Sequence, residues 1–116
     1  MDAAKIRLSA EEQELVSQAG WILTKNRLLE KIKTFFASLQ QDYKLQLDTI
    51  PGLKEVAGSN PKISGGENYR GLPWVVLDYP RCFSKTDVFA IRTMFWWGHF
   101  FSLTLQLSGR YKQQFE

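Results

Sequence analysis

The chain has 116 residues, the length of one compact domain, and 44% of them are hydrophobic, 23% charged and 14% aromatic. Its formal net charge of +3 does not identify a polyanion-binding protein. The single cysteine, Cys82, excludes an internal disulfide, and the single histidine, His99, leaves the chain without the His and Cys set of a zinc site. We expect one domain of a reducing, cytoplasmic compartment, with no metal and no cofactor.

No secretory signal or membrane span is predicted. Residues Met1–Leu8 are polar and lack the apolar centre of a signal peptide. The longest apolar candidate, Val88–Leu107, is interrupted by Arg92 and His99, so strands are expected there instead. The sequence therefore predicts no membrane partner.

A short first helix is predicted over Ala10–Gln18. Ser9 and Glu12 form the S-x-x-E pattern of a capping box, in which each side chain accepts from the other residue's backbone N–H. Gly20 is expected to end or kink this helix.

A long amphipathic helix is predicted over Ile22–Gln46, because apolar side chains recur there every three or four residues. This helix is expected to lie on the sheet, with Trp21 and Ile22 closing one end of the core. Its apolar stripe consists of Leu28, Leu29, Ile32, Phe35, Phe36, Leu39 and Tyr43.

Nucleic acid is not a favoured partner. The long helix carries Lys25, Arg27, Lys31 and Lys33, offset by Glu30, and no known nucleic-acid-binding motif accompanies them. We interpret this run as a solvated helix face, with nucleic-acid binding as the second interpretation.

The segment Asp48–Gly71 contains two of the four prolines and five of the eight glycines. A loop of this length is unusual in a compact domain, so we expect it to be functional, disordered or interrupted by a short helix such as Leu53–Ala57. Its part Ser64–Gly71 lacks the G-K-[ST] ending of a P-loop. We interpret that part as a turn-rich connection, or alternatively as a hinge presenting Tyr69 and Arg70.

Three antiparallel strands are predicted in the aromatic second half of the chain. Pro80 is expected to end the first strand, because proline cannot donate to a ladder, and a turn at Arg81–Thr86 follows. The strands are Leu72–Tyr79, Val88–Trp96 and His99–Ser108, the last two forming a hairpin around Trp97 and Gly98.

These elements predict an α+β, two-layer fold of order ααβββ. A short helix and a long helix pack on a sheet of about three strands, and the tail Arg110–Glu116 adds a strand or a helical turn. The strand Val88–Trp96 is apolar on both faces, so its second face is expected to meet another copy of the chain, another element or a ligand. A helix over Asp87–Trp97 remains open, although its aromatic and β-branched content favours a strand.

Arg92 is the most informative candidate for a binding site, because a guanidinium in mid-strand needs a carboxylate, an aromatic face or water. On the face away from the helix it would pair with Asp78 or lie over a ring. Alternatively, it lines a pocket for a small anionic or aromatic molecule. The candidate ligand-binding residues are Tyr69, Arg70, Trp74, Arg92, Trp96 and His99.

No catalytic site is predicted. His99 is the only imidazole, and Asp78 with Cys82 or Ser84 would be needed beside it for nucleophilic chemistry. Nothing in the spacing requires that arrangement, and no G-x-S-x-G elbow is present. We interpret His99 as a partly buried side chain beside Trp97.

Several segments between Lys62 and Gly98 resemble a small family of uncharacterised bacterial proteins. The resemblance implies no activity, so no functional residue is carried over from it. The matching segments are Lys62–Ser64, Gly66–Pro73, Leu77–Arg81 and Asp87–Gly98.

Two functions are expected. The first is a non-enzymatic interaction or assembly module, a homodimer formed through an aromatic sheet face. The alternative is a small-ligand-binding protein, or an enzyme, with an Arg/aromatic pocket near residues 62–71.

Overall fold

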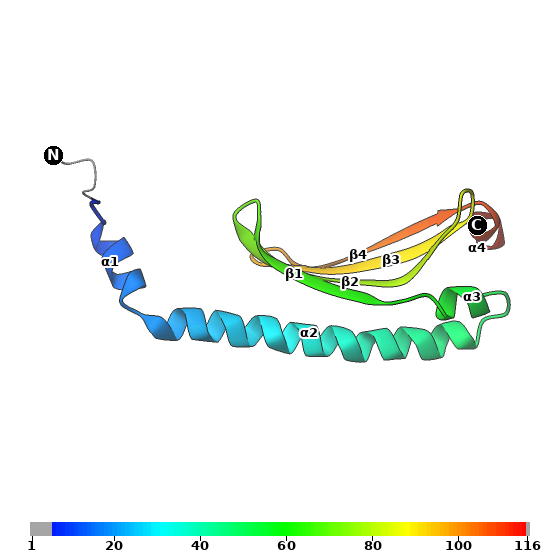
Figure 1. The fold of residues 1–116 in the computed structure, drawn as a ribbon, viewed down its shortest axis with the longest axis horizontal. Helices are drawn as coiled ribbons and strands as arrows, with labels where there is room; N and C mark the ends of the chain where they lie inside the picture. Colours follow the sequence, from blue (N-terminus) through cyan, green and yellow to red (C-terminus); the bar gives the residue numbers. More distant parts are fainter. Residues whose placement is uncertain (1–5, 116) are drawn as a thin grey trace.

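The structure is a computed structural model in which residues 6–115 are described. It is an α+β fold, in which one long helix lies along a four-stranded antiparallel sheet (Figure 1). The sequence predicted this class but only three of the four strands. In chain order the elements are α1 (Ala10–Val16), α2 (Ala19–Asp48), α3 (Lys54–Ala57), β1 (Lys62–Tyr69), β2 (Leu72–Phe83), β3 (Val88–Trp96), β4 (Phe100–Ser108) and α4 (Arg110–Phe115).

The start of α1 confirms the capping box. The backbone N–H of Glu12 donates to Ser9 Oγ at 3.0 Å, and that of Ser9 donates to Glu12 Oε1 at 2.7 Å. The expectation that Gly20 ends this helix is wrong. The Ser17 hydroxyl bonds the carbonyl of Glu14 and Gln18 is extended, so the chain turns before Gly20, which lies inside α2.

Strand β1 lies within the segment that the sequence predicted to be a loop. It forms one edge of the sheet, with Gly66 opposite Trp74 on β2. A Cβ on Gly66 would be only 2.7 Å from Trp74 Nε1, so the indole occupies the space over this glycine. A glycine-rich segment therefore forms a strand here because a neighbouring ring covers it.

The short helix predicted near Leu53–Ala57 is confirmed as α3.

Pro80 does not end β2, contrary to prediction. The strand continues to Phe83, and its pairing with β3 shifts register between Asp78 and Arg81. This bulge places the proline where the ladder requires no N–H donor. The following turn is consequently shorter than predicted, and the Ser84 N–H donates to the Asp87 carbonyl at 3.0 Å.

Strand β3 has the predicted bounds, and the alternative helix over this segment is wrong. The hairpin to β4 is confirmed as well, with Trp96 opposite Phe100. His99 lies in the turn, and its N–H donates to the Trp96 carbonyl at 2.8 Å.

The core lies between α2 and one face of the sheet. The Tyr79 hydroxyl, fully buried, donates to the carbonyl of Ala57 at 2.8 Å and so connects β2 to α3. Burial raises the pKa of Tyr79, which keeps this donor protonated. At the end of the sheet, the buried Tyr111 of α4 packs edge-on against Phe89. The core includes Leu29, Ile32, Phe36, Leu53, Val56, Val75, Leu77, Tyr79, Phe89 and Tyr111.

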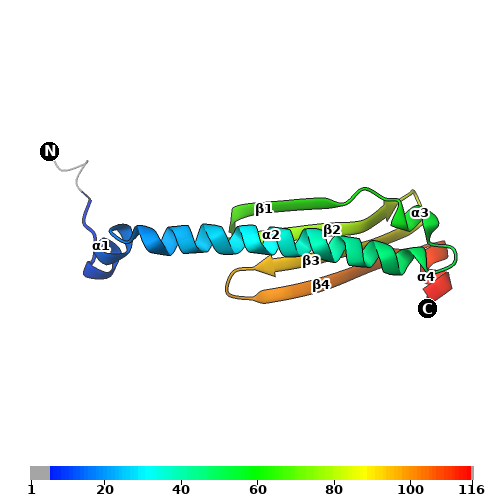
Figure 2. The ribbon, with the colours of Figure 1, turned by 90° about the horizontal axis from the view of Figure 1, so that it is seen from below.

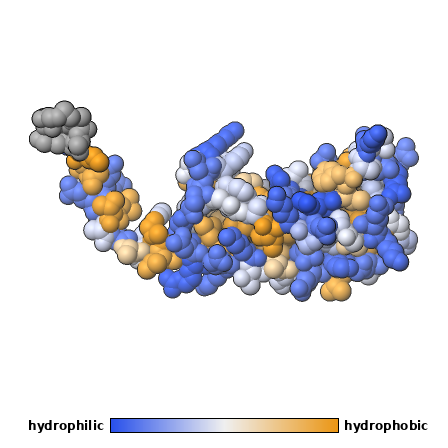
Figure 3. Space-filling view, viewed as in Figure 1, coloured by the Kyte–Doolittle hydropathy of each residue, from blue (hydrophilic) through white to orange (hydrophobic). Residues whose placement is uncertain are grey.

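Helix α1 and the first turns of α2, here called the arm, extend beyond the sheet (Figure 2). The described chain measures 68 × 28 × 20 Å, and its radius of gyration of 20.1 Å exceeds the ~13 Å of a compact domain of this length. Trp21 meets Trp97 with 6.5 Å between ring centroids, but Trp21 and Ile22 are each about half exposed, so they do not close the core as predicted. Apolar patches are visible along the arm (Figure 3).

Candidate functional site

The face of the sheet away from α2 is concave (Figure 1). The strand register places Lys62, Asp78, Arg92 and Thr104 in one row across all four strands. These residues are part of the lining of an open hollow of about 490 Å³. The uncovered face therefore carries a charged depression at its centre.

Arg92 pairs with Asp78 within this row. Arg92 Nε donates to Asp78 Oδ1 at 2.8 Å and Arg92 Nη2 to Asp78 Oδ2 at 3.0 Å, which is a bidentate pair. Hydrogen bonding to Asp78 raises the pKa of Arg92. Arg92 therefore points away from the helix, and its partner is the carboxylate, one of the alternatives that the sequence left open.

A double-mutant cycle measures this pair. We expect Arg92→Ala and Asp78→Ala each to lower the free energy of unfolding, with a coupling energy of about 1 kcal/mol, because the geometry is bidentate although Arg92 is largely exposed. Urea denaturation of the four proteins gives the coupling. A coupling energy of zero would show that the pair does not contribute to stability.

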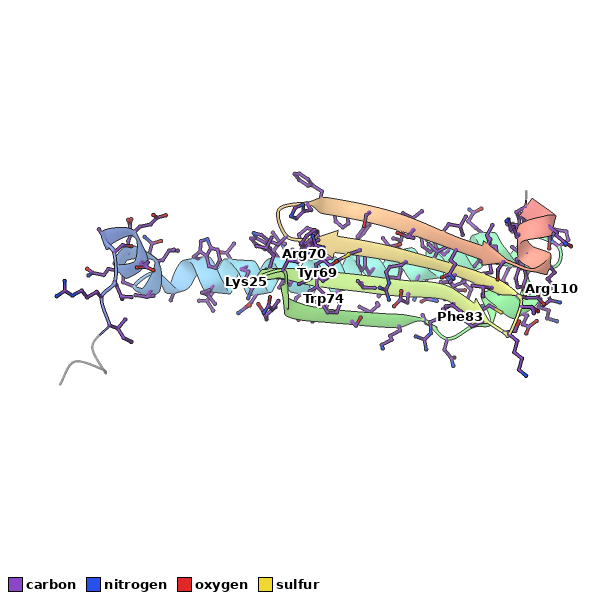
Figure 4. The ribbon with its side chains drawn as sticks, turned by 90° about the horizontal axis from the view of Figure 1, so that it is seen from above. Lys25, Tyr69, Arg70, Trp74, Phe83 and Arg110 are labelled. Carbon is purple, nitrogen blue, oxygen red and sulfur yellow. The ribbon has the colours of Figure 1, made fainter. Side chains whose placement is uncertain are left out.

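The other five candidate residues gather at the end of the sheet nearest the arm, where Figure 4 labels Tyr69, Arg70 and Trp74. Trp96 Nε1 donates to the Tyr69 carbonyl at 3.0 Å, and the two rings meet edge-on at 4.9 Å. His99 stacks on Trp96 with centroids 3.8 Å apart, and the Arg70 guanidinium lies 5.8 Å from the Tyr69 ring.

The structure therefore divides the predicted site into two parts. Trp74 and Trp96 are opposite each other in the register, whereas the pair of Asp78 and Arg92 lies four residues away from them on each strand. His99 is exposed and lies against Trp96, whereas the sequence predicted it to be partly buried beside Trp97, because the turn carries it to the concave side of the sheet. The register between strands, which the sequence does not specify, decides this division.

The residues considered for nucleophilic chemistry do not come together. Asp78 is held by Arg92, and the Cys82 thiol lies 3.8 Å from the Tyr111 hydroxyl. The Ser84 hydroxyl bonds the carbonyl of Asp87 in the turn after β2, whereas His99 lies in the turn at the other end of the sheet.

A different feature, missed from the sequence, is the exposed apolar side of the edge strand β4. Phe101, Leu103 and Leu105 point to the side of the sheet on which α2 lies, yet each is more than half exposed. Strand β4 is uncovered on this side because α2 packs mainly against β2, two strands away.

The two edges of the sheet differ in composition. Strand β1 carries Lys62, Glu67, two glycines and a register irregularity, and Glu67 pairs with Lys25 of α2. Strand β4, with the sequence FFSLTLQLS, has no charge, proline or glycine over nine residues. Charged side chains and bulges normally protect an edge from pairing with another strand, so β1 is protected and β4 is not.

Comparison with known proteins gives no match: no family model, no curated protein and no solved structure is significantly similar to the chain. Within residues 6–115, His, Cys, Asp and Glu form no group of three that could hold a metal ion. None of the helices in this part of the chain has both the length and the hydropathy of a membrane span.

Proposed function

We propose that the protein is a non-enzymatic assembly module whose copies associate through β4. The observation that carries this proposal is the unprotected edge: β4 is long, uncharged and apolar on an exposed side. An edge strand of this composition pairs readily with another strand. The sequence-based expectation placed the contact on the face away from the helix. The exposed apolar side chains of β4 favour the opposite side.

A second copy of the chain is the partner that fits this edge. Two β4 strands related by a two-fold axis run antiparallel, which continues the antiparallel pattern of the sheet. In such a pair centred on Thr104, Leu103 lies opposite Leu105 and Phe101 opposite Leu107, all on the apolar side. The same register places Ser102 opposite Gln106 on the concave side.

The test replaces an exposed residue of β4 with a charged one. Leu103 is 60% exposed, so Leu103→Lys removes little burial within one chain but places two like charges beside the two-fold axis. We expect wild-type protein to have twice the 13.4 kDa chain mass by native mass spectrometry and light scattering, and the variant to have the chain mass while remaining folded by circular dichroism.

Leu23→Lys is the matched control. Leu23 has the same 60% exposure but lies on the arm. We expect this variant to keep the wild-type mass. Dissociation by Leu23→Lys and not by Leu103→Lys would assign the association to the arm, and a monomeric wild-type protein would refute self-association.

A further inference from the structure

The hollow on the concave face has an identifiable structural cause. After the bulge in β2, the register places Arg81, Ala90 and Gln106 in a second row beside that of Asp78, Arg92 and Thr104. The short side chain of Ala90 stands between the long side chains of Arg81 and Gln106. The depression lies at this point of a sheet that is itself concave, and Phe83 completes the lining at one end (Figure 4).

The charges around the hollow are unbalanced. Lys62, Arg81 and Arg92 line it, against the single carboxylate of Asp78. Both oxygens of Asp78 accept from Arg92, so this carboxylate neutralises Arg92 alone. The Lys62 and Arg81 side chains have no ion-pair or hydrogen-bond partner within residues 6–115.

We propose that this hollow binds a small molecule through a carboxylate or phosphate group. Lys62 and Arg81 supply the unneutralised positive charge, and an Arg guanidinium matches the geometry of such oxyanions. The Thr104 hydroxyl and the Gln106 amide add neutral donors at the opposite wall. The exposed ring of Phe83 offers a flat apolar surface to the rest of the molecule.

Arg92 contributes positioned N–H donors to this site rather than unneutralised charge. Its bidentate pair with Asp78 fixes the guanidinium before any ligand arrives, which lowers the conformational entropy lost on binding. Lys62, Arg81 and Arg92 lie on β1, β2 and β3 of one chain, so the charged part of the proposed site lies outside the association through β4, whose concave side carries Thr104 and Gln106.

The test is a titration of the ¹⁵N-labelled protein with phenyl phosphate at low ionic strength, followed by NMR, with phenol as the uncharged control ligand. We expect saturable shifts at amides around the hollow with phenyl phosphate and none with phenol. Lys62→Gln and Arg81→Gln should each weaken binding about fivefold, the effect of one partly exposed charge.

Lys31→Gln is the control for net charge. Lys31 is an exposed lysine on α2, the element that lies on the opposite side of the sheet, so its removal should change the affinity by less than the hollow substitutions do. Equal weakening by all three variants, shifts that do not saturate, or equal shifts with phenol would overturn the proposal. Unchanged melting temperatures would show that the variants remain folded.

Discussion

Phe36→Ala is expected to lower the free energy of unfolding by about 3–5 kcal/mol, the usual cost of truncating a buried phenylalanine. Phe36 is fully buried at the centre of the contact between α2 and the sheet, and its ring meets Phe101 at 6.1 Å. The core is small, because the arm contributes little to it. The expected loss is therefore a large part of the free energy of unfolding, which is ~5–15 kcal/mol for native proteins. Urea denaturation followed by circular dichroism measures it.

Phe35→Ala is the matched control for that measurement. Phe35 is the preceding residue of α2, makes a similar edge contact with Phe101, and is 50% exposed. We expect this change to cost about 1 kcal/mol, because most of the ring's burial is missing. Both measurements need one fixed protein concentration, since association stabilises the folded state by mass action. Equal losses for the two variants would contradict the placement of α2 on the sheet.

Gly109→Ala is expected to cost about 2–4 kcal/mol, through backbone strain and a steric clash together. Gly109 has φ +61°, a left-handed conformation between β4 and α4. A Cβ there would lie 2.4 Å from the Thr86 carbonyl oxygen and 2.1 Å from Asp87 Oδ1. Asp87 Oδ1 also accepts the N–H of Arg110 at 2.9 Å, so it cannot move without releasing the start of α4. The melting temperature measures the loss.

Gly71→Ala is the control that separates backbone strain from the steric clash in the loss expected for Gly109→Ala. Gly71 has φ +86°, but a Cβ there would meet no atom within 4 Å. Its replacement should therefore cost only the backbone strain, about 1–2 kcal/mol. Faster amide exchange in residues 110–115 is expected for Gly109→Ala alone. Equal destabilisation by both substitutions would show that the turn before β3 does not approach Gly109 closely.

Elements with strong local signals could be predicted from the sequence. The capping box located the start of α1, and the aromatic and β-branched content located β3 with its observed bounds. The pair Arg92–Asp78 was one of the alternatives open from the sequence, because a mid-strand guanidinium needs a carboxylate, a ring or water.

Features that depend on distant neighbours could not be predicted. Strand β1 contains Gly65 and Gly66, which disfavour a strand until Trp74 is known to cover them. Pro80 is tolerated only because a bulge forms beside it. Alternation in β4 shows which residues share a face but not whether anything lies over that face. The hollow depends on register, which places Ala90 between Arg81 and Gln106.

The length of α2 determines where the two arms would lie in the proposed dimer. Thirty helical residues form a rod of about 45 Å, and its first turns project past the sheet. An antiparallel pairing of β4 strands would direct the two arms towards opposite ends of the dimer. The two arms of one dimer would therefore lie far apart and could not contact each other, so association through β4 would leave both of them uncovered.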